Sequence, residues 1–69
     1  MNELFFLVEE AIEGGYTARA LGEGIFTEGD TMDELKANIR EAVHCHYDNE
    51  ADIPKIIRLH LVKEEIITI

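Results

Sequence analysis

The chain has 69 residues, of which 15 are Asp or Glu and 6 are Lys or Arg, giving a formal net charge of -9. This length predicts one small domain spanning residues 1–69. Hydrophobic residues make up 46% of the chain, which is too many for a disordered acidic tail. The longest apolar run, Leu4 to Val8, is far shorter than the ~20 residues that a membrane-spanning helix requires. We therefore predict a soluble globular domain.

Location and partners are constrained by the same composition. No basic segment precedes an apolar stretch and a small-residue cleavage site, so no export signal is predicted. Cys45 is the only cysteine and cannot form a disulfide within the chain. Both observations favour a cytoplasmic location. Because DNA, RNA and anionic membranes are polyanions, we expect neither DNA binding nor membrane binding, and the charge favours a basic protein as partner.

The first part of the chain is predicted to form three strands in an antiparallel meander. Residues 2–10 are apolar on both faces of a strand, with Leu4, Phe6 and Val8 alternating with Phe5 and Leu7. Gly14-Gly15 indicates a turn into a second strand at residues 16–20, so these two strands are expected to pair as a hairpin. After Gly22-Glu23-Gly24, the β-branched and aromatic residues at 25–28 indicate a short third strand.

An amphipathic helix from Met32 to Tyr47 is the clearest local prediction. Thr31 fits the first position of a capping box, in which its hydroxyl accepts the Glu34 backbone N–H and the Glu34 side chain reaches back. Apolar residues then recur at helical spacing. The predicted core-facing residues are Met32, Leu35, Ile39, Ala42, Val43 and His46.

The end of the chain is strand-like. Pro54 introduces an extended segment, residues 55–69. One face of this segment carries Ile57, Leu59 and Leu61, and the other carries Ile56, Val62 and Ile66. Lys63-Glu64-Glu65 interrupts the apolar pattern, so either one long bent strand or two short strands would satisfy it.

These elements predict an α+β domain with the order β-β-β-α-β, in which an antiparallel meander has one helix packed on one sheet face. One helix covers only one face, whereas the first and last strands are apolar on both. A second copy of the chain is the simplest cover, because a small domain gains stability by oligomerising. We therefore expect a homodimer or a higher oligomer.

No spacing of His, Cys or acidic residues in the sequence predicts that their side chains meet in one catalytic or metal-binding site. In His44-Cys45-His46, residues two apart on a helix point about 200° apart, so the histidines cannot share one metal ion. We expect His46 to border the core and His44 to be exposed. Cys45 has no orienting acid or amide, and His60 has no catalytic partner. We therefore predict no catalytic, cofactor-binding or metal site.

The charged residues are expected to be solvated or locally paired. Lys36 and Arg40 lie on the outer helix face beside Asp33 and Glu41, which predicts ion pairs within the helix rather than a nucleic-acid-binding patch. Acids at strand ends and turns could bind a metal ion, but solvated carboxylates are the more ordinary interpretation. These acids are Glu3, Glu9, Glu10 and Glu13.

Three segments, Gly15 to Ala20, Ile25 to Leu35 and Asn38 to Ala42, resemble the HicB antitoxin family. In that family a Gly-Tyr-x-Ala strand leads to Thr-x-Gly-Asp-Thr and then to a helix containing Asn-Ile-x-Glu-Ala. The resemblance covers residues 4–47, and the C-terminal strand is compatible with it. The shared motifs describe a strand end, a tight turn, a helix N-cap and a core-facing helix, so they mark the fold more than a chemistry.

The resemblance implies a partial RNase H fold and a role in a toxin–antitoxin system, in which HicB binds and blocks HicA, a small basic ribonuclease. The proline-containing loop of the family is replaced here by the shorter Leu21 to Gly24. The C-terminal DNA-binding domain of full-length members has no counterpart in this sequence, so operator binding is not implied. No catalytic carboxylates of an RNase H enzyme are matched, so nuclease activity is not implied either.

We therefore expect a protein-interaction module, not an enzyme, that binds and inhibits a basic HicA-like toxin. The acid-rich edges expected to contact the toxin are Glu9, Glu10 and Glu13, or Glu64 and Glu65. One alternative is a stand-alone structural or small-ligand-binding HicB-like domain without a toxin partner. A more distant alternative is a small hydrolase or nuclease that uses strand-end carboxylates and His60.

Overall fold

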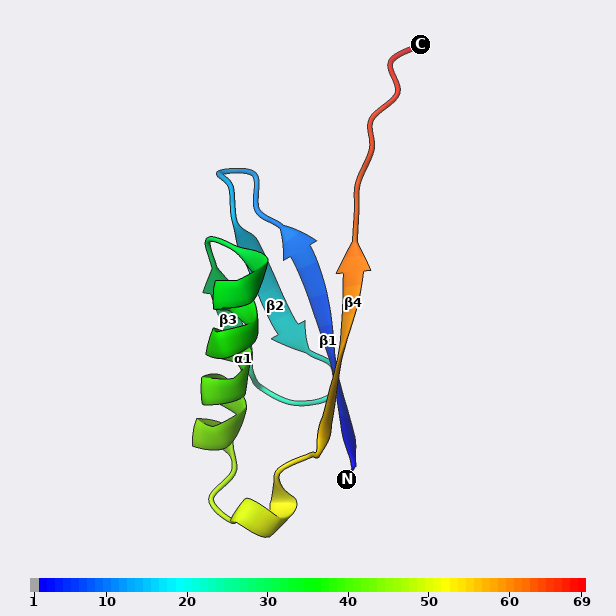
Figure 1. Ribbon diagram of the computed structural model, residues 1–69. Coiled ribbons are helices and arrows are strands. Elements are labelled where there is room, and N and C mark those ends of the chain that lie inside the picture. Colours follow the sequence, from blue (N-terminus) through cyan, green and yellow to red (C-terminus); the bar gives the residue numbers. More distant parts are fainter. Residues whose placement is uncertain (1) are drawn as a thin grey trace.

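Four strands and one long helix form an α+β domain in the computed structural model, which describes residues 2–69. The elements are β1 (Glu3–Glu10), β2 (Tyr16–Ala20), β3 (Phe26–Gly29), α1 (Met32–His46), the 3₁₀ turn η1 (Glu50–Asp52) and β4 (Ile56–Val62). The sheet has the strand order β3-β2-β1-β4, and α1 packs across one face (Figure 1). None of the helices in residues 2–69 has the length and apolar character needed to cross a membrane.

The predicted hairpin between the first two strands is confirmed. β1 and β2 are antiparallel, with Glu10 opposite Tyr16 at the turn. Gly14 and Gly15 adopt φ values of 101° and 79°, a region that residues with a Cβ rarely occupy. The Ala11 N–H donates to the Gly15 carbonyl at 3.0 Å and closes the turn. β3 then pairs antiparallel with β2, as the meander predicts.

The position of β4 corrects the predicted antiparallel meander. β4 is parallel to β1, with Leu4 opposite Ile57 and Val8 opposite Leu61, so the sheet is mixed. The reason is the helix: α1 runs back along the sheet, and the chain therefore enters β4 at the end where β1 begins (Figure 1). The Asn2 carbonyl fixes this entry by accepting the N–H groups of Lys55 and Ile56 at 3.1 and 3.0 Å.

The core lies between α1 and the covered sheet face. β1 contributes alternate residues and α1 contributes three residues at helical spacing, as predicted. The buried apolar residues are Leu4, Phe6, Val8, Ala18, Ala20, Ile25, Leu35, Ile39 and Val43. Met32 and Ala42 are half-buried at the margin. The prediction for His46 is wrong: it is exposed, and its Nε2 lies 3.3 Å from Oε2 of Glu23, which belongs to the loop between β2 and β3.

The helix ends where local signals indicate. Thr31 is the N-cap, and its Oγ1 accepts the Glu34 N–H at 3.1 Å, which confirms this half of the capping box. The helix ends at His46, one residue before the predicted end, and Tyr47 is its C-cap. The Tyr47 side chain packs against the core, so it anchors the chain as it leaves the helix.

The hydroxyl of Tyr47 is tested with a Tyr47→Phe variant, which keeps the aromatic ring. The Tyr47 hydroxyl oxygen is buried and has no hydrogen-bond partner among residues 2–69. Desolvation, together with the negative charges of Glu23 and Asp52, raises the Tyr47 pKa above its ordinary value of 10.0. We expect the free energy of unfolding of the variant at neutral pH to be unchanged or higher, because a hydroxyl without a hydrogen-bond partner is removed.

The same variant has a defined pH dependence. The folded state holds the Tyr47 proton more tightly than the unfolded chain does, because the Tyr47 pKa is raised on folding. The free energy of unfolding therefore falls as pH rises above the ordinary tyrosine pKa. Urea titrations at rising alkaline pH should show this loss in the natural chain and a smaller loss in Tyr47→Phe. An equal loss in both chains would contradict the shifted pKa.

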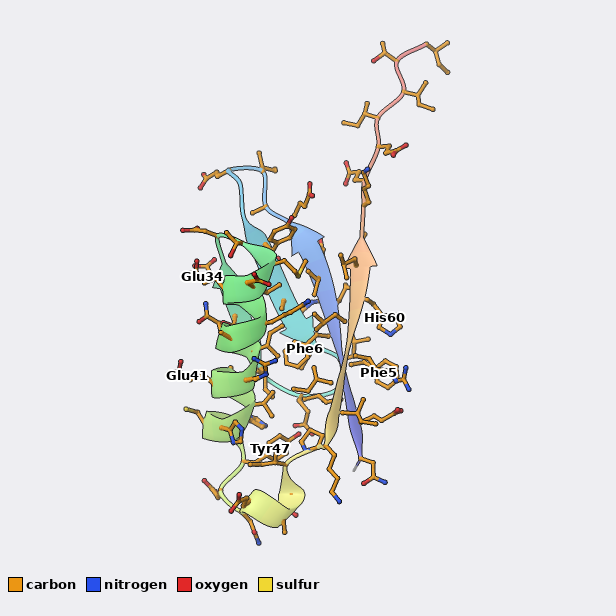
Figure 2. The ribbon with its side chains drawn as sticks, in the orientation of Figure 1. Phe5, Phe6, Glu34, Glu41, Tyr47 and His60 are labelled. Carbon is orange, nitrogen blue, oxygen red and sulfur yellow. The ribbon has the colours of Figure 1, made fainter. Side chains whose placement is uncertain are left out.

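The sheet face opposite α1 is not covered by any other element among residues 2–69, as the apolar pattern predicts. Phe5 and Leu7 are half-buried there, and Phe26 is 63% exposed. Figure 2 shows Phe5 and His60 side by side on this open face, with ring centroids 5.3 Å apart, while Phe6 points toward the helix.

The C-terminal residues 63–69 extend away from the body of the domain (Figure 1). Of the predicted segment 55–69, only Ile56–Val62 pairs with another strand of the chain. Both sequence alternatives, one long strand or two short ones, are therefore wrong for residues 63–69, because β1 ends at Glu10 and the chain turns there toward β2. We call residues 63–69 the tail.

Candidate acidic interaction surface

The sheet topology brings the two predicted acidic edges to the same end of the domain. β1 and β4 are parallel, with Glu9 opposite Val62, so both strands end there. Glu9 and Glu10 close β1 and Glu13 lies in the following turn, all three exposed. The tail carries the exposed Glu64 and Glu65 beyond this end. The sequence presented these edges as alternatives, and the parallel pairing makes them neighbours.

Further carboxylates that the sequence did not assign to this surface join it from β3 and α1. Tyr16 is opposite both Glu10 and Gly29, so the end of β3 lies at the same end of the sheet as the end of β1. Glu28 and Asp30 flank Gly29, and Glu34 lies in the first turn of α1. In the sequence these acids flank two turns and the helix N-cap, and only the strand register shows that they lie together.

A groove of about 680 Å³ separates the β1–β2 turn from the start of α1. Its acidic lining residues are Glu13, Glu28, Asp30 and Glu34, and we call it the acidic groove. Tyr16 and Asn38 also line it. The Asn38 side-chain amide donates to the Glu28 carbonyl at 2.7 Å, which holds the edge of β3 against α1.

No intrachain cation neutralises the acidic groove among residues 2–69. The ion pairs of this part of the chain lie elsewhere, and they are Arg58–Glu3, His46–Glu23 and Lys63–Glu65. Carboxylates at a shared groove repel one another, and this repulsion is relieved when cationic side chains enter. The geometry of the acidic groove therefore suits Lys or Arg side chains of a partner.

The histidines and the cysteine do not form a reactive site in the described chain. His44, Cys45 and His46 are exposed at the end of α1, and His60 is exposed on β4 at the open sheet face. Among residues 2–69, no three His, Cys, Asp or Glu side chains are placed to hold a metal ion.

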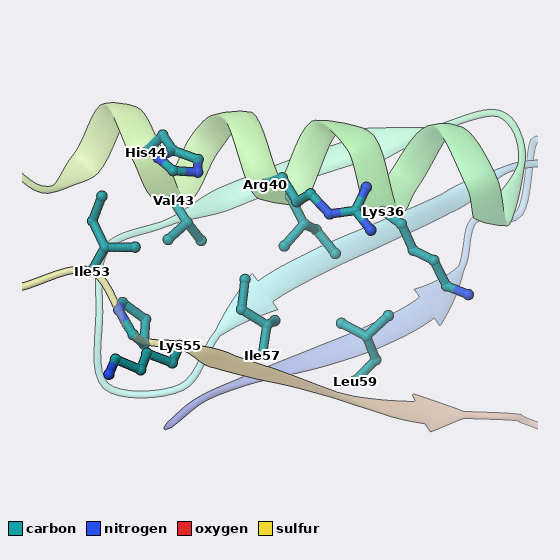
Figure 3. A pocket seen from close by; sticks show the side chains of 10 residues that line it. Lys36, Arg40, Val43, His44, Ile53, Lys55, Ile57 and Leu59 are labelled. Atoms are coloured by element: carbon teal, nitrogen blue, oxygen red, sulfur yellow. The ribbon is translucent and has the colours of Figure 1, made fainter. Parts of the chain in front are cut away.

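A second groove has the opposite charge and lies between α1 and β4. It measures about 530 Å³, and its floor is apolar, formed by residues of α1 and β4 that include Ile39, Val43, Ile57 and Leu59. Lys36, Arg40 and Lys55 stand along it (Figure 3). We call it the cationic groove.

The cationic groove corrects the predicted ion pairs within the helix. Among the described residues, neither Lys36 nor Arg40 forms an ion pair with Asp33 or Glu41. Figure 3 shows Lys36 and Arg40 along the side of α1 that faces β4 across the groove. This placement arises because α1 packs closest to β3 and β2, so the side of β4 that faces the helix stays open.

Two relatives identify the family of the chain. A UPF0150 protein of Archaeoglobus fulgidus is 49% identical over 56 residues, which cover 81% of this chain and 82% of the relative. A UPF0150 protein of Thermotoga maritima is 39% identical over 68 residues, which cover 99% of this chain and 94% of the relative. No family model and no solved structure matches the chain. At this identity and coverage, the chain belongs to the UPF0150 family.

Proposed function

We propose that the chain is an acidic protein-interaction module of HicB type, which binds and blocks a small basic ribonuclease in the cytoplasm. The observation that carries the proposal is the acidic groove, which Glu13, Glu28, Asp30 and Glu34 line without forming an ion pair to any cation of residues 2–69. The net charge of -9 makes the domain as a whole attractive to a basic partner.

The physical argument concerns the surface that an RNA-cleaving enzyme must present. Such an enzyme needs positive side chains to hold the phosphates of its substrate. A folded domain with carboxylates around a groove can cover those side chains, and opposite charges accelerate the encounter. Inhibition then follows from occupying the RNA-binding surface, without any chemistry performed by this chain.

The arrangement of the HicB-like motifs supports the proposal. The observed order is β-β-β-α-β, which is the order that the resemblance implies. The Thr-x-Gly-Asp-Thr motif, residues 27–31, forms the end of β3 and the N-cap of α1. Two of its residues, Glu28 and Asp30, line the acidic groove. In this proposal the motif therefore positions contact residues as well as the helix, within a partial RNase H fold.

The proposal is tested with a Glu13→Lys/Glu28→Lys variant and a basic ribonuclease of HicA type encoded beside this chain. Both glutamates are exposed, so the variant should remain folded. We expect its association rate at low salt to fall at least about tenfold, because the groove now repels the partner. Stopped-flow measurements over a range of salt concentrations should also show a weaker salt dependence than for the natural chain.

Glu41→Lys/Glu50→Lys is the matched control, since it makes the same change in net charge outside the acidic groove. Its association rate should fall by less than about threefold. Equal effects of the two variants would show that total charge, and not the groove, governs binding. If no basic ribonuclease is encoded nearby, or if it neither binds nor is inhibited, the stand-alone interpretation replaces this one.

A further inference from the structure

The tail has the chemistry of an unpaired β-strand. Ile66 and Ile67 are 84% and 86% exposed, and Ile69 is also exposed. Such a run of isoleucines is costly to leave in water, and β-branched residues favour extended strands. The tail continues directly from β4 and contacts no other strand of the described chain (Figure 1).

The outer edge of β4 is open to another strand. β4 is the last strand of the sheet order, so one row of its backbone N–H and C=O groups has no strand partner in residues 2–69. The opposite edge differs, because β3 is short and Asn38 bonds to the Glu28 carbonyl there. Edge addition is therefore favoured at β4.

The cationic groove lies beside this open edge. Ile57 and Leu59 point from β4 toward α1 and form part of its floor, with Lys36 and Arg40 beside them (Figure 3). A strand added to the β4 edge would place alternate side chains on this same side of the sheet. The groove therefore selects a strand that alternates apolar with acidic groups on one side.

The tail has that composition. Glu65, Ile67 and Ile69 share one side of an extended strand, so an acidic group and two apolar groups follow one another on that side. The tail cannot readily reach the groove of its own chain, because it would have to reverse immediately after Val62. Residues 63–69 contain no Gly, Pro, Asn or Asp to form such a turn.

We propose that the tail of one copy pairs antiparallel with the β4 edge of a second copy and enters its cationic groove, and that the exchange is reciprocal. β4 and the tail match in length, since Ile56–Val62 and residues 63–69 each have seven residues. When the two copies meet at Val62, Ile67 of one lies opposite Ile57 of the other, and Glu65 lies opposite Leu59. Glu65 then faces Lys36 and Arg40 across the groove.

Sedimentation equilibrium of charge variants tests the exchange. Glu65→Lys should weaken dimerisation at least about tenfold, since it places a cation in the cationic groove. Lys36→Glu/Arg40→Glu should weaken it similarly. An equimolar mixture of the two variants should recover the dimer, because each groove then meets a tail of opposite charge. Glu64 points to the other side of the strand, so Glu64→Lys should change the dimer dissociation constant by less than about threefold.

Apolar variants provide a second test. Ile67→Asp should leave a folded monomer by circular dichroism and sedimentation, whereas Ile66→Asp, on the other side of the strand, should retain most of the dimer. A monomeric natural chain, or a mixture of charge variants that stays monomeric, would overturn the proposal. So would a dimer that survives Ile67→Asp but is lost on Phe26→Asp, because it would use the open sheet face. The Glu13→Lys/Glu28→Lys variant should still dimerise, so failure here and failure of ribonuclease binding are distinguishable.

Discussion

Replacing Gly29 with alanine is expected to lower the free energy of unfolding by about 3 kcal/mol or more. An added Cβ would lie 2.6 Å from the Leu35 nitrogen, 2.9 Å from the Leu35 Cα and 3.1 Å from the Glu34 carbonyl carbon. These are backbone atoms of α1, so no side-chain rotation relieves the clash. The helix would have to move off β3, and the packing of Leu35 in the core would be lost.

Gly24→Ala is the matched control for this prediction. A Cβ added at Gly24 meets no atom within 4 Å, so its unfolding free energy should change by less than about 1 kcal/mol. Urea denaturation followed by circular dichroism measures both variants. Similar stabilities for the two would mean that α1 does not approach β3 as closely as described.

Replacing Ile39 with alanine is expected to lower the free energy of unfolding by about 2–5 kcal/mol. Ile39 is 2% exposed and lies in the middle of α1, between Leu35 and Val43 on the buried helix face. The substitution removes buried methyl groups and leaves a cavity that the short sheet cannot fill. Ile12→Ala, at a fully exposed position in the β1–β2 turn, should change stability by less than about 0.5 kcal/mol.

The same urea titration decides the Ile39 prediction. A loss below about 0.5 kcal/mol for Ile39→Ala would show that the buried face of the helix is misassigned. A loss in the expected range, with an unaffected Ile12→Ala, would support the packing of α1 on the sheet.

Local signals in the sequence are sufficient to predict the first three strands and the helix. The Gly14-Gly15 turn, the alternation in β1 and the Thr31 cap each depend on neighbouring residues, which a sequence displays directly. The direction of β4 is a long-range property. It depends on α1 returning the chain to the start of β1, which no local pattern around Ile56–Val62 encodes.

The acidic surface was predictable in its residues but not in its shape. Glu9, Glu10 and Glu13 stand out by charge alone, whereas their proximity to Glu28 and Asp30 depends on strand register. The cationic groove escaped prediction for a related reason. Lys36 and Arg40 have acidic neighbours in sequence, and only the packing of α1 beside β4 shows that they stand along a groove instead.

The central claim is that the chain blocks a basic ribonuclease through its acidic end. The most direct test adds increasing amounts of the chain to that ribonuclease and measures the rate of RNA cleavage. The partner is a HicA-type protein encoded beside this chain, with a fluorescent RNA as substrate. We expect cleavage to fall in proportion to added chain and to cease near equivalence, with Glu41→Lys/Glu50→Lys behaving identically and Glu13→Lys/Glu28→Lys failing to inhibit. Full cleavage in the presence of excess folded natural chain would contradict the claim.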